Sequence, residues 1–301
     1  MRIVVMGQAA FGRDVFEALR AAGEDVVGVS TPTPGSRPDP LHEAATAAGL
    51  PTVETPALQR DEPFERFAAL QPDLLVFAFV TDIVRTRALE TATLGAIEYH
   101  PSLLPLHRGR SAMNWSLIAG DERTGLTVFW VDAGIDTGPV LLQREVEVGP
   151  EDSVGSLYFE RLYPMGVEAL VEATRLVREG RAPRVEQDHS LATYEPACEA
   201  EHGRIDWMHH SSVVFNLIRG CDPQPGASTA LRGEPLRLFD ARRRVGTSTE
   251  TPGTVIAVTD GRVEVAGIGG TIEIGRVQRA GEGKVAAGEV LQTGDVLERV
   301  S

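Results

Sequence analysis

The chain of 301 residues carries 43 acidic and 29 basic side chains, which gives a formal net charge of −14. Hydrophobic residues make up 42% of the sequence and charged residues 24%, a composition typical of folded globular proteins and unlike that of disordered or fibrous chains. The length suggests about two domains at roughly 150 residues each. The acidic balance argues against binding through the phosphates of a nucleic acid, since such proteins gather Lys and Arg on one face.

The cysteine content and the lengths of the apolar runs indicate the cellular compartment of the protein. The sequence has only Cys198 and Cys221, without the spacing of a metal or disulfide framework, as is usual for a reduced compartment. The N-terminal apolar run is too short for a signal peptide, and the longest run, residues 74–80, is far shorter than the ~20 residues of a membrane span. We therefore expect a cytoplasmic protein that does not cross a membrane.

The N-terminal part alternates short apolar strands with amphipathic helices. Strands are expected at residues 2–6, 26–29, 52–53, 73–80, 96–100, 127–131 and 140–148, with helices at residues 11–19, 42–49, 63–71 and, as one long helix, 154–180. Strand 73–80 is apolar throughout, which suits a strand covered on both faces. This pattern predicts a doubly wound α/β domain with a parallel sheet.

Beyond residue 180 the pattern changes to polar, Pro-containing sequence, a helix at residues 211–220 and then short alternating strands. These strands, at residues 234–239, 253–258, 261–267 and 269–274, are separated by Gly-containing turns. Short strands at near-regular spacing predict a small β-barrel. We expect one domain over residues 1–200 and a second over residues 201–301.

The first strand ends in the turn GQAAFG, residues 7–12, where Ala9 takes the place of the middle glycine of a dinucleotide fingerprint. That glycine lets the backbone approach a pyrophosphate, so the turn argues against a nicotinamide cofactor. Metal chemistry is not expected either, because His209 and His210 are the only adjacent histidines and no HExxH motif or Cys/His cluster occurs.

Two groups of polar residues are candidates for acid and base chemistry. Glu98 and His100 lie two apart on a predicted strand, so both side chains leave the sheet on the same face. Asp132 and Asp136 bracket a Gly-containing loop between two apolar runs. Each group also has a structural interpretation, as a satisfied pair on a strand and as turn aspartates that bind their own backbone, and spacing alone does not decide between the two.

Three motifs together resemble the 10-formyltetrahydrofolate-dependent formyltransferases: HPSLLP at residues 100–105, HRG at 107–109 and GIDTGPVL at 134–141. RIDW at residues 204–207 and NLIRGCDPQPGA at 216–227 are similar to methionyl-tRNA formyltransferases. YHPSLLP, SAMNW and TYE resemble most the hydrolase domain of 10-formyltetrahydrofolate dehydrogenases. The resemblance implies a Rossmann-like formyltransferase domain followed by an OB-like barrel.

The resemblance further implies 10-formyltetrahydrofolate as the formyl donor, with an Asn, a His and an Asp converging on the formyl carbon. His100 matches the His and Asp136 the Asp, but Glu98 stands at the Asn position. An ionised Glu98 would repel the oxyanion of the tetrahedral intermediate, which an Asn amide would stabilise. Glu98 is therefore either a neutral donor, a partner of the His100 imidazolium, a general base, or the mark of a site that has lost formyl transfer.

The family pattern also places the ligands. The folate is expected along residues 79–84 and 131–135, where the implied contacts are Ile83, Val84, Leu89, Val131, Asp132, Ala133 and Gly134. Candidates for acceptor binding are Gln8, Phe11, Arg108 and Ser111. For Arg108 and Ser111 the alternative is capping of the helix that follows.

The expected function is formyl transfer from 10-formyltetrahydrofolate to a small amine or hydroxylamine, with His100 and Asp136 carrying the reaction and Glu98 tuning it. Hydrolysis of the donor to formate and tetrahydrofolate is the first alternative, and a catalytically silent folate-binding protein is the second. A tRNA acceptor is disfavoured, because residues 30–40 form a short segment with a single arginine where the tRNA enzymes carry a basic insertion.

Overall fold

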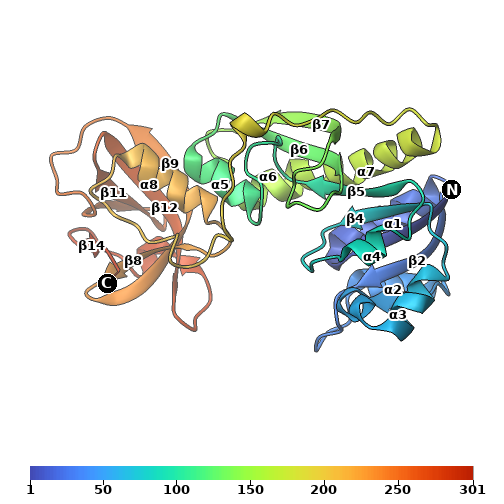
Figure 1. The fold of residues 1–301 in the computed structure, drawn as a ribbon. Helices are drawn as coiled ribbons and strands as arrows, with labels where there is room; N and C mark the ends of the chain where they lie inside the picture. The colour runs from blue at the N-terminus through green and yellow to red at the C-terminus, as the bar shows by residue number, and fades with distance from the viewer. Residues whose placement is uncertain (301) are drawn as a thin grey trace. The chain divides into compact units, whose positions relative to one another are not determined.

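The computed structural model describes residues 1–300, which form two compact units (Figure 1). The first unit comprises Met1–Arg108, Gly125–Glu145 and Arg161–Thr193, and the second comprises Gly109–Thr124, Val146–Glu160 and the chain from Tyr194 onward. In the described part of the chain, no helix is both long and apolar enough to cross a membrane.

The first unit is built on a seven-stranded sheet with the order β3-β2-β1-β4-β5-β6-β7. Its strands are β1 (Arg2–Gly7), β2 (Asp25–Thr31), β3 (Thr52–Glu54), β4 (Leu74–Ala78), β5 (Gly95–His100), β6 (Arg123–Trp130) and β7 (Val140–Glu147). The first five strands pair in parallel, whereas β5 and β6 pair antiparallel. The predicted Rossmann-like sheet is confirmed, and it carries an antiparallel extension beyond β5.

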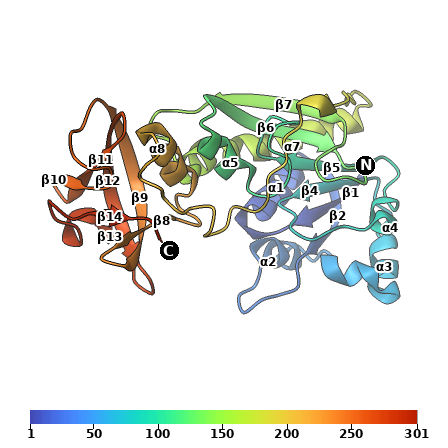
Figure 2. The ribbon, with the colours of Figure 1, turned by 60° about the vertical axis from the view of Figure 1, so that its left-hand side comes forward.

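Helices cover both faces of this sheet (Figure 2). Side chains alternate along each strand, so each face of the sheet presents its own apolar residues to the helices that cover it. Ile3 and Val5 of β1 face one hydrophobic cluster, and Val4 and Met6 face the other. The first cluster contains residues of α1 (Ala9–Ala21), α2 (Pro40–Ala47) and α7 (Tyr163–Arg178). The second contains residues of the 3-10 helix Thr55–Gln59, α3 (Asp61–Ala68) and α4 (Thr86–Leu89).

The turn after β1 depends on a glycine. A Cβ atom on Gly7 would lie 2.1 Å from the carbonyl oxygen of Ala78, so only glycine allows β1 and β4 to approach this closely. Ala9, at the fingerprint's glycine position, adopts a φ of 58°. Its backbone N–H donates to Oδ2 of Asp39, whose Oδ1 accepts from the N–H of Leu41 at the start of α2. An internal carboxylate therefore occupies the start of α1.

The long helix predicted over residues 154–180 is interrupted. α6 (Val154–Leu157) is followed by a π-helical turn, Tyr158–Leu162, before α7 begins. Pro164 lies in the first turn of α7 and has no N–H to continue an unbroken α-helical ladder, which explains the break. The apolar periodicity persists through the break, and that is why the sequence indicated one helix.

The second unit contains α5 (Ala112–Ala119), α8 (Ser211–Gly220) and an antiparallel, curled half-barrel sheet consistent with an OB-like domain. The sheet order is β10-β11-β12-β9-β8-β14, with β13 paired to β12. Its strands are β8 (Ala227–Leu231), β9 (Glu234–Val245), β10 (Val255–Thr259), β11 (Arg262–Gly267), β12 (Gly270–Arg279), β13 (Val285–Ala286) and β14 (Leu297–Glu298). Short 3-10 helices lie at His189–Leu191 in the first unit and Ala287–Glu289 in the second.

The division into units differs from a single boundary near residue 200, because α5 packs with α8. The Nδ2 of Asn114 donates to the carbonyl oxygens of Gly220 and Gln224 at 2.7 and 2.9 Å. A Cβ on Gly220 would lie 2.6 Å from Cγ1 of Ile118. Residues 109–124 therefore pack with the C-terminal elements although they precede β6.

Candidate active site

Strand β5 places Glu98 and His100 on one face of the first sheet. Glu98 pairs with Phe77 of β4 and Phe129 of β6, and His100 pairs with Thr127. Ile97 and Tyr99, which alternate with them along the strand, face the cluster beneath α1 and α7, so Glu98 and His100 point to the opposite face. The shared face predicted from their spacing is confirmed. The His100 side chain is buried, whereas Glu98 is half-buried.

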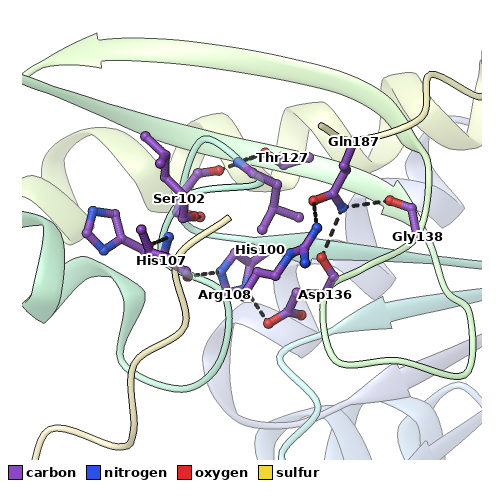
Figure 3. A network of polar contacts seen from close by, with 11 residues as sticks. His100, Ser102, His107, Arg108, Thr127, Asp136, Gly138 and Gln187 are labelled. Atoms are coloured by element: carbon purple, nitrogen blue, oxygen red, sulfur yellow. Dashed lines mark hydrogen bonds and ion pairs between the residues drawn. The ribbon is translucent and has the colours of Figure 1, made fainter. Parts of the chain in front are cut away.

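The loop after β5 fixes the orientation of the His100 ring (Figure 3). Nε2 of His100 lies 2.8 Å from the carbonyl oxygen of His107. A carbonyl only accepts, so Nε2 carries the hydrogen in this contact. Thr127 holds the loop from β6 by donating its hydroxyl to the carbonyl oxygen of Ser102 at 2.7 Å. Nδ1 of His100 remains for chemistry, and it lies 3.7 Å from Oδ2 of Asp136.

The two aspartates of the loop after β6 have different surroundings. Oδ1 of Asp132 accepts from the N–H of Gly134 at 2.9 Å and the hydroxyl of Thr137 at 2.7 Å, so Asp132 stabilises the turn. Asp136 adopts a φ of 55° and directs a carboxylate that is only 11% exposed toward His100. The structure therefore gives one aspartate the turn role and brings the other to the imidazole.

Glu98 is the most perturbed carboxyl group at this site. Burial raises its pKa to about 8, and the nearby negative charge of Asp136 adds to the shift. Among the described residues no hydrogen bond and no cation stabilises the Glu98 carboxylate. A carboxyl group with this pKa is mostly protonated at neutral pH and then carries an O–H donor.

Comparison with known proteins identifies the architecture. The Formyl transferase family profile matches residues 1–174, and the profile of its C-terminal domain matches residues 198–294. The chain belongs to the formyl transferase family. Among curated relatives, cytosolic 10-formyltetrahydrofolate dehydrogenase of Xenopus tropicalis is 42% identical over 245 residues, which are 79% of this chain and 27% of that protein.

Two further matches, one to a curated relative and one to a solved structure, span nearly the whole chain. Methionyl-tRNA formyltransferase of Trichlorobacter lovleyi is 36% identical over 297 residues, 96% of this chain and 93% of that protein. HypX from Aquifex aeolicus, solved in complex with tetrahydrofolic acid, matches with a TM-score of 0.71 at 21% identity, covering 97% of this chain and 47% of that one. The chain thus spans about a quarter of the dehydrogenase relatives and nearly all of the methionyl-tRNA enzyme.

Within this formyl transferase, the segments predicted to contact folate present exposed apolar side chains. Ile83 is 90% exposed, Ile135 59% and Phe79 48%. Val84, Leu89 and Val131 are partly buried and pack against the hydrophobic cluster on the Glu98 face of the sheet. Ala133 and Gly134 lie exposed in the turn that Asp132 stabilises. Exposed apolar side chains on segments whose neighbouring residues pack on this cluster are candidates for contact with an aromatic ring.

The predicted acceptor residues have different surroundings. Gln8 donates from Nε2 to the hydroxyl of Thr81 at 3.2 Å, beside a small crevice lined by Gly7, Pro32, Thr55 and residues 79–82. Phe11 is 2% exposed and packs against the rings of Tyr99 and Tyr163, so its side chain belongs to the core and offers no surface to an acceptor.

Arg108 and Ser111 do not cap α5. Arg108 is 8% exposed and directs Nη2 at Gln187 and His189. Ser111 occupies the N-cap position of α5 with a φ of 65° but makes no side-chain cap, and its hydroxyl accepts from the N–H of Cys198 at 3.1 Å. Within residues 1–300 no group of His, Cys, Asp and Glu is arranged to hold a metal ion.

Sequence reasoning missed Gln187. Its side chain is 6% exposed and bonds to the Asp136 loop and to Arg108. The residue lies in a polar, Pro-containing segment without regular secondary structure, and no periodicity marks it. The only available signal was its position six residues before Thr193-Tyr194-Glu195, a motif that resembles the family.

Proposed function

We propose that this formyl transferase moves the formyl group of 10-formyltetrahydrofolate to a small-molecule amine or hydroxylamine in the cytoplasm. The observation that carries the proposal is the arrangement of three side chains at the end of β5. His100 has Nε2 bound to a backbone carbonyl and Nδ1 facing Asp136, and Glu98 lies on the same strand face. In the proposed reaction Glu98 is the hydrogen-bond donor, His100 is the base, and Asp136 is the carboxylate that stabilises the protonated His100.

In the first step the acceptor nitrogen attacks the formyl carbon. A carbon–nitrogen bond forms and the carbonyl electrons move to oxygen, which becomes an oxyanion. A protonated Glu98 donates its O–H to this oxygen, as an amide would. The raised pKa of Glu98 supports this role, because an ionised carboxylate would oppose the developing charge.

The proton follows a short path through His100. Nδ1 accepts the proton that the acceptor nitrogen loses, and the Asp136 carboxylate stabilises the resulting imidazolium. The intermediate then collapses, the bond from carbon to N10 breaks, and the same proton passes from His100 to N10. The products are the formylated acceptor and tetrahydrofolate, so atoms and charge balance.

The apolar surface beside the site supports folate as donor. A pterin ring stacked on Phe79, Ile83 and Ile135 would bury side chains that are otherwise 48%, 90% and 59% exposed. At about 25 cal/mol per Å² of apolar area, covering such side chains contributes a few kcal/mol to binding. The backbone groups of residues 131–135 supply polar contacts for the ring edge.

Charge pairing supports a small acceptor over a tRNA. In the second unit, four arginines of the curled sheet and its turns are bound to carboxylates: Arg232 to Asp295, Arg242 to Glu151, Arg244 to Glu273, and Arg262 to Asp240. A tRNA backbone would have to compete with these carboxylates. At the turn after β1, Asp39 already accepts from the N–H of Ala9, which disfavours an acceptor phosphate there.

Hydrolysis of the donor is the second candidate. It is favoured by the 42% identity to a 10-formyltetrahydrofolate dehydrogenase over 79% of this chain. Water would then take the place of the amine, with His100 and Asp136 in unchanged roles, and the products would be formate and tetrahydrofolate.

The test is a tetrahydrofolate release assay on the purified protein. 10-Formyltetrahydrofolate is supplied alone, then with a panel of small amines and hydroxylamines, and then with methionyl-tRNA. His100→Ala is compared with His209→Ala, an exposed histidine in the second unit. The proposal expects amine-dependent release that His100→Ala reduces by about 10²- to 10⁴-fold and His209→Ala leaves unchanged.

The other outcomes identify the alternatives. Rapid His100-dependent release without any amine supports the hydrolase. Release only with methionyl-tRNA overturns the small-acceptor proposal. Binding of the donor without release under any condition supports a silent folate-binding protein. Full activity in His100→Ala contradicts the proposed mechanism.

A further inference from the structure

Gln187 joins the loop that carries Asp136 to the loop that holds His100. Its Nε2 donates to the carbonyl oxygens of Asp136 at 2.9 Å and Gly138 at 2.7 Å, and its Oε1 accepts from Nη2 of Arg108 at 2.7 Å (Figure 3). Both amide hydrogens are therefore used on the Asp136 loop. Gln187 is 6% exposed, so water does not readily replace these bonds.

Arg108 connects this amide to the His100 loop. The arginine follows His107, whose carbonyl oxygen accepts from Nε2 of His100 at 2.8 Å. The N–H of Arg108 donates to the carbonyl oxygen of Thr193 at 3.0 Å, and that of His107 to the Thr193 hydroxyl at 2.8 Å. Residues 187–193 thus bind both loops, one through Gln187 and the other through Thr193.

The Asp136 loop needs such support because of its backbone. Asp136 has a φ of 55°, a conformation that costs a side-chain-bearing residue about 1 kcal/mol or more. A Cβ on Gly138 would lie 1.7 Å from the carbonyl oxygen of Trp130, so this end of the loop is tightly packed against β6. Two hydrogen bonds from one amide fix the carbonyls on either side of Thr137.

We propose that Gln187, oriented by Arg108, is a positioning residue that sets the distance between the Asp136 carboxylate and Nδ1 of His100. The inference rests on the proposed roles of His100 and Asp136. It assigns Arg108 to the support of the site and not to the acceptor. Without the amide hydrogens of Gln187, the loop relaxes and the carboxylate moves away from both His100 and Glu98.

Gln187→Met tests this, because methionine matches glutamine in length and lacks both donors. Asn114→Leu is the matched control in the second unit, since the Asn114 amide also donates to two backbone carbonyls. Arg108→Met is a second test variant, with a smaller expected effect, because it removes the contacts with the oxygen of Gln187 and with Nδ1 of His189 but leaves both amide hydrogens of Gln187 on the Asp136 loop. Thermal unfolding of each variant is measured to check that it folds.

The first readout is kinetic. With the donor and acceptor from the release assay, Gln187→Met should lower kcat by about tenfold, the loss typical of groups that orient a catalytic side chain, with KM for the donor within about twofold. Asn114→Leu should leave kcat unchanged. A normal kcat in Gln187→Met at reduced thermal stability means a structural role and overturns the proposal.

The second readout does not depend on activity. The charge of Asp136 raises the pKa of Glu98, so the pKa reports how close the two carboxyl groups lie. A ¹³C NMR titration of Glu98 should show a lower pKa in Gln187→Met, a larger decrease in Asp136→Asn, and no change in Asn114→Leu. An unchanged Glu98 titration in Gln187→Met contradicts the proposal even if the protein proves inactive as a formyl transferase.

Discussion

Each of the two units brings two carboxyl groups together, with opposite consequences. In the curled sheet, Arg262 bonds to Asp240 at 2.6 Å and also to Glu273. At the end of β5, Glu98 and Asp136 approach one another and the neighbouring side chain is the imidazole of His100. A guanidinium is always charged and neutralises its partners, whereas an imidazole gains and loses a proton near neutral pH.

The difference separates a structural cluster from the cluster of Glu98, His100 and Asp136, which we propose to be reactive. In the Arg262 cluster each carboxylate has a cation, because Arg262 bonds to both Asp240 and Glu273 and Arg244 also pairs with Glu273. The cluster stabilises the pairing of strands β9, β11 and β12. At β5, Glu98 has its pKa raised to about 8, which costs folding free energy at high pH. A carboxyl group retained at such a cost, beside a buried histidine, is typical of catalysis.

Asp136→Asn should have the largest effect of these substitutions on the rate of formyl transfer. The variant retains a similar shape but removes the charge that stabilises a His100 imidazolium, so formyl transfer should slow by about 10²- to 10⁴-fold. Asp240→Asn in the structural cluster should leave the rate unchanged. Rates are measured as tetrahydrofolate release. A comparable loss of rate in Asp136→Asn and Asp240→Asn would mean that Asp136 has no particular role in formyl transfer.

Glu98→Gln should remove a pH-dependent instability. Folded protein binds the Glu98 proton more tightly than unfolded protein, so stability falls as pH rises from about 4.5 through 8. The full loss is at most about 5 kcal/mol, and it is absent from Glu98→Gln. Urea unfolding at pH 6 and pH 9 measures this. If both proteins lose stability equally between these pH values, Glu98 does not carry the raised pKa.

Arg262→Met should weaken the structural cluster without affecting chemistry. It leaves Asp240 without its cation, whereas Glu273 keeps its pair with Arg244, and the second unit should lose about 2 kcal/mol of stability. Urea unfolding and the release assay are run on the same preparation. A large change in kcat at unchanged stability would contradict the assignment of this cluster to folding.

Ile83→Ala should have the smallest effect, which is a weaker binding of the donor 10-formyltetrahydrofolate. If folate covers Ile83 as proposed, removing most of this exposed side chain should weaken donor binding by about 1 kcal/mol, roughly fivefold in Kd. Val245→Ala, at an 82% exposed position of β9, is the control. Fluorescence titration with 10-formyltetrahydrofolate measures both, and equal affinities would remove Ile83 from the folate surface.

Periodicity predicted the fold well where burial dominates. The alternating strands and helices of the first unit, and the shared face of Glu98 and His100, follow from patterns that repeat along the sequence. The break between α6 and α7 does not appear in such a pattern, because the apolar positions continue through the π-helical turn. Phe11 was misassigned to the acceptor because a buried aromatic and a ligand-facing one are alike in sequence.

The site itself depends on loops, and there sequence patterns are weaker. Spacing did not distinguish Asp132 from Asp136; the resemblance selected Asp136, and the structure shows Asp132 bonded within its own turn. Gln187 lies 51 residues from Asp136 and contacts its backbone carbonyl. Neither the residue type nor the neighbouring sequence at either position indicates this contact.

The pH dependence of formyl transfer tests the central claim most directly. If protonated Glu98 donates to the oxyanion, kcat of the wild-type protein should fall as pH rises through about 8, where Glu98 ionises. Glu98→Gln retains a donor at all pH values, so it should stay active and lose that limb of the profile. A wild-type rate that rises through pH 8, together with inactivity of Glu98→Gln, would contradict the account and identify Glu98 as a general base.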